Sequence, residues 1–343
     1  MRIATYNVEW FTNLFDHHGR LLEDGEWSSR FGVTRADQIG SLGIVFSAMD
    51  ADAVMVIEAP DQNKQRTTCG QLETFAAKFG LRTRKAVMGF ASETEQEIAL
   101  LYDPDKLTPV HDPVGEPTGK KGAAGAPRFD GVFRLDLDTD ATPETISFSK
   151  PPLELAVTTA AGFRFRLIGV HAKSKAPHKV TAEAEAIRVG IENRRKQLAQ
   201  CIWLRARVDQ HLAAHVPLVV LGDFNDGPGL DEYEKLFGHS GVEIMLGLDR
   251  PPEERLYEPH AQMVLGQTFA VGPTTARFYL TGKHRYFQAL LDYIMISPDL
   301  RAKASEWRIW HPFDDPVCWK TVELREALLA ASDHFPVTVD LDI

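Results

Sequence analysis

The sequence has few cysteines and no long hydrophobic run. Its three cysteines, Cys69, Cys201 and Cys318, are widely spaced and show neither a CxxC pattern nor a Cys/His metal spacing. The small number and wide spacing of the cysteines predict a reducing, cytoplasmic setting for the protein. The longest apolar run, residues 216–221, contains Pro217 and falls far short of the roughly 18 apolar residues that a membrane helix needs. The chain is therefore predicted not to span a membrane.

The sequence is expected to carry no export signal, and it has no excess of basic residues. The first strand-like segment begins at Arg2, which leaves no room for the charged and apolar regions of a secretory signal. With 38 Lys and Arg against 48 Asp and Glu, the formal net charge is -10. This charge disfavours long duplex substrates, because proteins that bind nucleic acid without sequence preference usually carry a basic surface. It does not exclude nucleic acid, since a divalent cation and a few Lys or Arg can make a site locally positive.

The composition is that of an ordinary globular protein, with many short strand patterns. Its 343 residues, of which 44% are hydrophobic, can bury a large core. No internal repeat or low-complexity linker divides the sequence, so we predict one α+β domain with stacked sheets over residues 1–343. Helices are expected at 34–48, 182–213 and 323–330, and strands at 2–6, 53–57, 98–102, 132–137, 154–159, 163–170, 218–221, 291–296 and 336–341.

Two segments lie outside this pattern. Residues 113–127 are rich in Gly, Pro and Lys, but Gly115 and Gly119 enclose three residues rather than the four of a Walker loop, and no Ser or Thr follows the lysines. We interpret this segment as a surface loop. Residues 227–288 show weak periodicity and are interpreted as an insertion that shapes substrate access. Substrate specificity is expected to lie in these two segments.

Polar side chains stand where several predicted strands end. Asp223 and Asn225 follow a continuously apolar strand and, two positions apart, would face the same side. There a carboxylate can orient or deprotonate water, and an amide can donate to a phosphate oxygen; an Asx-rich turn is the alternative. His334 is a natural base near neutral pH. Asp292, a carboxylate within an apolar strand, is a candidate to orient it.

Three more strands end in a polar residue. Asn7, Glu58 and His171 each have an ordinary explanation: a turn or cap, a solvent-facing strand end, and a satisfied core histidine. Together with Asp223 and His334, however, they favour a common functional edge where a sheet gathers its strand ends.

The combination resembles the endonuclease/exonuclease/phosphatase superfamily, which has the pancreatic deoxyribonuclease-like fold, and within it bacterial nuclease-like members. The motifs occur in that family's order from residue 5 to residue 337, so the resemblance covers nearly the whole chain. The blocks that carry it are Thr5-Tyr6-Asn7-Val8-Glu9-Trp10, Val56-Ile57-Glu58, Val170-His171-Ala172-Lys173-Ser174-Lys175, Gly222-Asp223-Phe224-Asn225, Leu291-Asp292-Tyr293-Ile294 and Ser332-Asp333-His334-Phe335-Pro336-Val337.

The resemblance implies a fold, a reaction and a set of site residues. The fold would be a four-layer α/β/β/α sandwich with two packed mixed β-sheets. The reaction would be phosphoester hydrolysis with Mg²⁺, or alternatively Mn²⁺, and hard oxygen ligands suit both ions. Whether His334 or Asp223 takes the proton from water stays open. The implied roles are catalytic for His334, Asp292, Asp223, Asn225 and His171, phosphate-binding for Asn7, Asn225, His171 and Lys150, and metal-binding for Glu58, Asn7 and Asp333.

Some positions depart from the family pattern or allow two interpretations. Lys150 stands where many relatives have an arginine. A lysine keeps the positive charge, but it lacks the guanidinium group that binds a phosphate through two parallel hydrogen bonds. Glu9 lies where some nucleases place a second acidic ligand, with a surface position as the alternative. Arg194 and Arg195 either support the site through a salt bridge or lie on a solvated helix face.

Three functions are compatible with this sequence. The leading interpretation is a metal-dependent nuclease or other phosphodiesterase, favoured by the block around His171. The alternative is a phosphatase or phospholipase-like enzyme on a small or lipid phosphoester, of the inositol phosphate or sphingomyelin type, favoured by the acidic charge. A non-catalytic interaction module is disfavoured, because no expected catalytic position is lost. A calcineurin-type metallophosphatase would need a Gly-Asn-His block that the sequence lacks. The sequence gives no indication of the oligomeric state.

Overall fold

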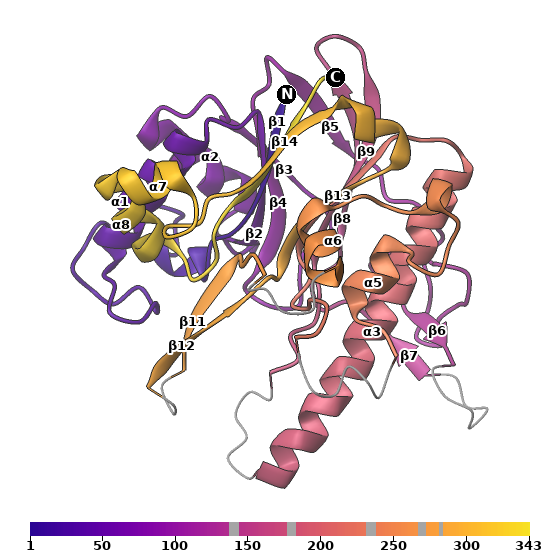
Figure 1. The fold of residues 1–343 in the computed structure, drawn as a ribbon. Helices are drawn as coiled ribbons and strands as arrows, with labels where there is room; N and C mark the ends of the chain where they lie inside the picture. Colours follow the sequence, from indigo (N-terminus) through magenta and orange to yellow (C-terminus); the bar gives the residue numbers. More distant parts are fainter. Residues whose placement is uncertain (137–143, 177–182, 231–237, 267–271, 281–283) are drawn as a thin grey trace.

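Two β-sheets pack face to face between two layers of helices (Figure 1). The computed structural model describes residues 1–136, 144–176, 183–230, 238–266, 272–280 and 284–343. Both sheets are mixed, since each contains one parallel strand pair among antiparallel ones. The α+β class and the four-layer sandwich are as predicted.

The first sheet has six strands in the order β14-β15-β1-β2-β4-β3. Its outer face packs against helices α1, α2, α7 and α8 in one hydrophobic core. The strands are β1 (Arg2–Asn7), β2 (Ala53–Ala59), β3 (Lys85–Met88), β4 (Glu97–Tyr102), β14 (Ala304–Ile309) and β15 (Val337–Leu341). The helices are α1 (Arg35–Met49), α2 (Thr68–Phe79), α7 (Pro316–Lys320) and α8 (Val322–Ala331).

The second sheet has five strands in the order β13-β10-β9-β8-β5. Helices α3, α5 and α6 cover its outer face in a second core. No helix in the described part of the chain is long and apolar enough to cross a membrane. The strands are β5 (Leu107–His111), β8 (Leu153–Thr159), β9 (Arg164–His171), β10 (Leu218–Asp223) and β13 (Asp292–Ile296), and the helices are α3 (Glu183–Ala213), α5 (Gly241–Leu246) and α6 (Pro259–Gly266).

Smaller elements connect these layers. A two-stranded ribbon, β11–β12, projects from the body of the molecule (Figure 1). The smaller elements are η1 (Phe11–Leu14), β6 (Phe133–Leu135), β7 (Glu144–Ile146), η2 (Pro252–Glu254), β11 (Ala276–Leu280), β12 (Arg285–Ala289) and η4 (Pro298–Lys303).

The central strands are buried on both faces, which explains their continuous apolar sequences. In β2, Met55 and Ile57 enter the core between the two sheets, whereas Val54 and Val56 face the helices. The same alternation places Val219 of β10 between the sheets. Two-sided burial thus fixes the register of these strands, because a slip by one residue would exchange the two faces.

Most predicted elements are confirmed, with ends shifted by one or two residues. The strand expected at 132–137 is shorter, and residue 137 lies outside the described residues. The segment 113–127 forms no helix or strand, as predicted, but Ala126 near its end is buried in the second core, where Arg207 donates to its carbonyl oxygen at 2.9 Å. The segment 227–288 contains α5, α6, β11 and most of β12, which are too short to give a clear periodic pattern.

The ends of four central strands meet at one edge, away from the two termini (Figure 1). β1 runs parallel to β2 in one sheet, and β9 runs parallel to β10 in the other. Parallel neighbours end on the same side, so the residues after these strands are brought together. This edge holds the strand-end residues that the sequence analysis identified.

Gly222 allows β10 to approach β9 closely just before this edge. Its φ is +139°, and a Cβ atom there would lie 2.0 Å from the carbonyl oxygen of Val170. We expect Gly222→Ala to lower the free energy of unfolding by about 3 kcal/mol, through backbone strain and overpacking. Gly40→Ala in α1 is the matched control, since a Cβ meets nothing within 4 Å there. Urea denaturation measures both variants, and equal midpoints would contradict the prediction.

Candidate active site

The site forms where the two sheets contact each other at their strand ends. Asn7 ends β1 of the first sheet and Asp223 ends β10 of the second. The side-chain amide Nδ2 of Asn7 donates to Oδ2 of Asp223 at 3.0 Å, and both side chains are buried. Parallel pairing places His171 directly beside Asp223. The predicted convergence of Asn7, His171 and Asp223 is therefore observed.

His334 is held on several sides. Its ring nitrogen Nδ1 lies 2.7 Å from Oδ2 of Asp292, and both side chains are buried. The backbone N–H of Asp292 donates to Oγ1 of Thr275 at 2.9 Å. The backbone N–H of His334 donates to Oγ of Ser332 at 3.1 Å, and that hydroxyl donates to the carbonyl oxygen of Asn7 at 2.7 Å. Asp292 thus orients the imidazole, as expected, and is not a water-facing strand residue.

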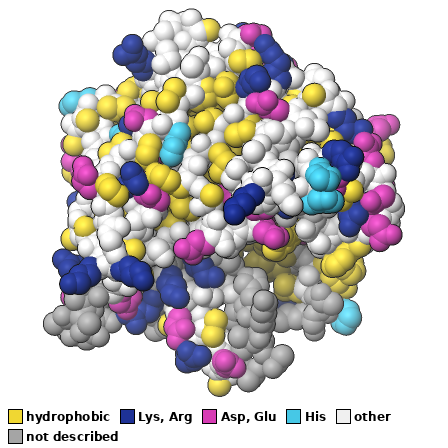
Figure 2. Space-filling model, turned by 180° about the vertical axis from the view of Figure 1, so that it is seen from behind, with side chains coloured by type: hydrophobic (Ala, Val, Ile, Leu, Met, Phe, Trp, Pro, Cys, Tyr) yellow, Lys and Arg dark blue, Asp and Glu magenta, His cyan; other side chains and the backbone are white. Residues whose placement is uncertain are grey.

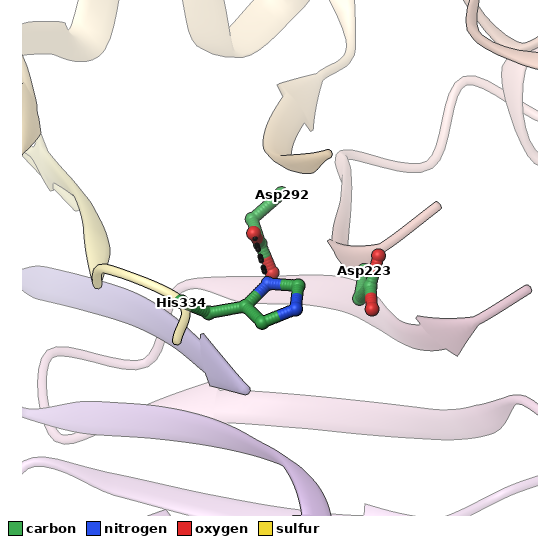
Figure 3. Close-up of side chains that lie close together, drawn as sticks. All are labelled: Asp223, Asp292 and His334. Carbon is green, nitrogen blue, oxygen red and sulfur yellow. Dashed lines mark hydrogen bonds and ion pairs between the residues drawn. The ribbon is translucent and has the colours of Figure 1, made fainter. Parts of the chain in front are cut away.

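Asp223 lies on the other side of the imidazole from Asp292 (Figure 3). One ligand atom from each of Asp223, Asp292 and His334 lies within 4.8 Å of the others, and we call these residues the acid–base cluster. Burial alone lowers the pKa of His334, but the neighbouring carboxylates raise it well above the ordinary value. Burial raises the pKa of Asp223 to about 7. Near neutral pH the cluster therefore combines an imidazolium with a carboxylate that can exchange a proton.

Asp223 and Asn225 are close together, as predicted, but by a different local structure. β10 ends at Asp223, and Asn225 has a φ of +50°. The backbone N–H of Asn225 donates to Oδ1 of Asp223 at 2.7 Å, which is an Asx turn. Its side-chain Nδ2 lies 3.2 Å from Oδ2 of Asp223. The turn and the functional interpretation therefore describe the same structure.

His171 and Lys150 form the basic side of the site. Nε2 of His171 lies 3.7 Å from Oδ2 of Asp223 and 3.4 Å from Nζ of Lys150. Burial and the charge of Lys150 lower the pKa of His171 well below its ordinary value, so the ring is neutral at pH 7. Its buried Nδ1 has no hydrogen-bond partner among the described residues. A neutral imidazole and a lysine can together contact an anionic oxygen.

Glu58 is aimed at the site by an irregularity in β2. The register with β4 shifts between Ile57 and Ala59, and Glu58 has a φ of +59°. Such bulges redirect a side chain and are frequent beside active sites. The backbone N–H of Trp10 donates to Oε2 of Glu58 at 2.9 Å, and burial raises the pKa of this carboxyl group.

Glu9 is neither a solvent-facing residue nor a free ligand. Its Oε2 accepts the backbone N–H of Asp333 at 3.0 Å and forms an ion pair with the guanidinium of Arg30. Burial, together with the charges of Glu9 and Glu58, raises the pKa of Asp333 to about 8. Glu9 therefore positions Asp333, which resolves the two interpretations of this residue.

The donor set at this edge fits a divalent cation. Glu58 and Asp333 offer hard carboxylate oxygens whose raised pKa values reflect burial and mutual repulsion, which a cation would relieve. Asn7 offers an amide oxygen from the adjacent strand. The acid–base cluster is a poorer cation site, because Nδ1 of His334 is already bound to Asp292 and the ring is positively charged.

The arginines on α3 differ from each other. The side chain of Arg194 is buried, so the expectation of a solvated helix face is wrong for this residue. Arg195 forms an ion pair with Glu144 in β7. Both residues lie on α3, which packs over the second sheet. Their burial depends on the neighbours of this helix and could not be predicted from the periodicity of its sequence.

Three residues that hold the site have no clear signal in the sequence. Nε2 of Gln197 in α3 donates to the carbonyl oxygen of Asn225 at 2.9 Å, and Thr275 accepts the N–H of Asp292. Arg30 binds Glu9. Each is a single polar residue in a loop or helix, and only contacts with distant segments give it a role.

Comparisons with known proteins agree with this architecture. The model of a family described as endonuclease/exonuclease/phosphatase matches residues 4–334. A 3′-5′ exonuclease from Neisseria meningitidis has 17% identity and a TM-score of 0.51, with 100% of each chain covered. An AP endonuclease from Archaeoglobus fulgidus has 11% identity and a TM-score of 0.53, with 100% of each chain covered. A mannosyl-6-phosphatase from Bacteroides thetaiotaomicron has 14% identity and a TM-score of 0.50, again with 100% of each chain covered. No curated protein sequence matches the chain significantly.

The raised pKa values make the stability of the metal-free protein depend on pH. The folded protein holds protons on Asp223 and Asp333 up to a pH of about 7 and about 8, whereas an unfolded Asp loses its proton near pH 4. The free energy of unfolding is therefore expected to fall as pH rises from about 6.5 to 8. The pKa of His334 is also raised, and this group acts in the same direction.

Urea denaturation in EDTA across this pH range tests the expectation. Asp223→Asn should show a shallower decline, because the group that titrates is removed. Asp249→Asn, which changes an exposed Asp on the surface, should follow the wild-type curve. A stability that rises with pH over this window would be the opposite result.

Proposed function

Because the chain belongs to the endonuclease/exonuclease/phosphatase family, whose enzymes hydrolyse phosphoesters with a divalent cation, we propose that it is a Mg²⁺-dependent nuclease. The single observation that carries the proposal is the acid–base cluster, in which His334 lies between Asp292 and Asp223 (Figure 3). Phosphoryl transfer needs an in-line water and preplaced charge rather than covalent help from the protein. The buried cluster supports both requirements.

In this proposal Asp223 accepts the proton of the attacking water. Its pKa of about 7 suits a general base at neutral pH. His334, kept as an imidazolium by Asp292, offers positive charge to the phosphate at the start of the reaction and a proton to the leaving oxygen. The alternative, in which His334 itself is the base, needs a lower histidine pKa than these carboxylates favour.

The other site residues would bind the phosphate and the cation. His171 and Lys150 donate to the non-bridging oxygens. The amide of Asn225 donates to the carbonyl oxygen of Ala172 and to Asp223 in the free protein, and it would exchange one of these bonds for the phosphate. A cation held by Glu58 and Asp333, with Asn7, would offset charge on the same oxygens when bound. The amide of Asn7 also fixes Asp223 through its 3.0 Å hydrogen bond, so it couples the two halves of the site.

A nucleic-acid substrate is favoured over the alternatives by the residues around the site. Lys173 and Lys196 have no ion-pair partner in the part of the chain that the structure describes. The charge of Lys173 acts on Lys150 at the site, and that of Lys196 acts on Lys173, so both lysines can contact a phosphate chain. The exonuclease and the AP endonuclease of similar fold support a nuclease. The phosphatase of similar fold keeps a small phosphoester as the second candidate.

A substrate panel with Mg²⁺, Mn²⁺ and EDTA arms tests the substrate class. The panel contains single-stranded DNA, RNA, abasic duplex, inositol phosphates and sphingomyelin. We expect cleavage of nucleic acid. Selective hydrolysis of an inositol phosphate or of sphingomyelin would replace the nuclease by the phosphatase or phospholipase-like alternative.

Substitutions in the cluster and at Glu58 test the mechanism. His334→Ala, Asp223→Ala and Glu58→Ala are each expected to lower kcat/KM by at least about 100-fold, the scale of a positioned acid, base or charge stabiliser. Steady-state hydrolysis of bis(p-nitrophenyl) phosphate measures this. His239→Ala, at an exposed histidine, is the control and should keep wild-type activity. A folded His334→Ala protein with wild-type turnover would refute the proposed mechanism.

Metal removal gives an independent test. EDTA should abolish hydrolysis, and Mg²⁺ or Mn²⁺ should restore it. Glu58→Gln keeps the size of the side chain but loses the charge, so the Mg²⁺ concentration for half-maximal activity is expected to rise at least about tenfold. Glu253→Gln, at an exposed position, should leave that concentration unchanged. Full activity in EDTA would refute the metal requirement.

A further inference from the structure

An exposed aromatic surface borders the site at the β11–β12 ribbon. The rings of Phe31 and Tyr279 stack with centroids 4.6 Å apart and an interplanar angle of 22°. The ring of Tyr286 lies 5.1 Å from that of Tyr279. Phe31 is 65% exposed and Tyr286 is 46% exposed. We call Phe31, Tyr279 and Tyr286 the aromatic shelf.

The shelf is fixed to the site from two directions. The ribbon begins at the site, because the backbone N–H of Arg277 donates to the carbonyl oxygen of Asp333 at 2.7 Å. Tyr279 follows two residues later, about 7 Å farther along the strand. Phe31 directly follows Arg30, whose guanidinium binds Glu9. Since Glu9 also holds the backbone of Asp333, both parts of the shelf are anchored at the same point.

The two faces of the ribbon differ. Phe278 points to the site, where its ring meets that of His334 edge-on at 5.4 Å. The opposite face carries Arg277 and Tyr279, because neighbouring residues of a strand point to opposite sides. The guanidinium of Arg277 lies 3.4 Å from the ring centroid of Tyr286, and no described carboxylate lies within ion-pair distance of it. The shelf therefore combines ring faces with an uncompensated cation.

We propose that the aromatic shelf stacks the bases of an unpaired nucleic-acid strand whose scissile phosphate lies at the acid–base cluster. The inference rests on the proposed nuclease function and names its substrate class. Ring faces bind bases irrespective of sequence, and an arginine beside them contacts the phosphates. Figure 2 shows hydrophobic side chains in and around a hollow in the lower part of the molecule, with Lys and Arg side chains gathered to its left.

An unpaired strand fits this surface better than a duplex. The faces of stacked bases are hidden in a duplex, whereas single strands present them to aromatic side chains. The net charge of -10 also disfavours the many phosphate contacts of duplex binding. Two or three local cations, such as Arg277, Lys173 and Lys196, suffice for a strand held mainly by stacking.

The ribbon is poorly suited to enter a lipid bilayer. The described residues nearest its tip are Leu280, His284 and Arg285, of which His284 and Arg285 are exposed. Insertion of this end would carry the charge of Arg285 into an apolar phase, which is costly. The aromatic side chains lie behind these residues and alongside the site, where a strand leaving the active centre would run.

Binding of a labelled single-stranded oligonucleotide in EDTA tests the proposal without cleavage. By fluorescence anisotropy, Phe31→Ala and Tyr286→Ala are each expected to raise Kd about tenfold, the scale of one lost base–aromatic stack. Phe31→Trp should retain tight binding, because it keeps a ring face. Trp319→Ala, at a 51% exposed aromatic residue on α7, is the matched control and should bind as the wild type does.

Other outcomes would overturn the proposal. The first is an unchanged Kd for the oligonucleotide in both alanine variants. The second is duplex binding by the wild-type protein as tight as its binding of the single strand. The third is that the alanine substitutions weaken binding to sphingomyelin and phosphatidylcholine vesicles but not to the oligonucleotide. Hydrolysis of bis(p-nitrophenyl) phosphate, which is too small to reach the shelf, should be unchanged in Phe31→Ala and Tyr286→Ala. If the wild-type protein fails to hydrolyse that diester, the nuclease proposal fails, whereas the binding assay still decides the role of the shelf.

Discussion

The hydrogen bond between Asn7 and Asp223 joins the two β-sheets at the edge where the polar strand ends gather. The two residues are 216 positions apart in sequence, and each ends a strand with a parallel neighbour. Face-to-face packing of the sheets places these ends together. The other site residues depend on that junction, because Ser332 holds His334 by bonding to the carbonyl oxygen of Asn7.

The electrostatics of the site follow from this burial. Several carboxylates face one another at low exposure, and the pKa values of Asp223 and Asp333 rise to about 7 and about 8. Such a cluster is destabilising without compensation. Arg30 offsets part of the charge through Glu9, and His334 offsets another part beside Asp292. The remaining excess of negative charge makes the edge a favourable place for a divalent cation.

Local patterns were sufficient for the central strands but not for the periphery. β2 and β10 were predictable because burial on both faces demands uninterrupted apolar residues. The short elements α5, α6 and β11 were hidden in a segment that looked like an insertion, because a helix or strand of five to eight residues carries little periodicity. The aromatic shelf lies partly in that segment, so it could not be predicted from the sequence.

The sequence by itself determined which polar residues end or precede the central strands, and hence the candidates Asn7, Glu58, His171, Asp223 and His334. Alternation along a strand and the order of the motifs are local properties, so they can be read without coordinates. Only the tertiary structure decided that Oδ2 of Asp292 lies 2.7 Å from Nδ1 of His334 and that Arg30 forms an ion pair with Glu9. Neighbours across layers depend on sheet packing, and pKa shifts depend on burial, and neither is a property of a local stretch of sequence.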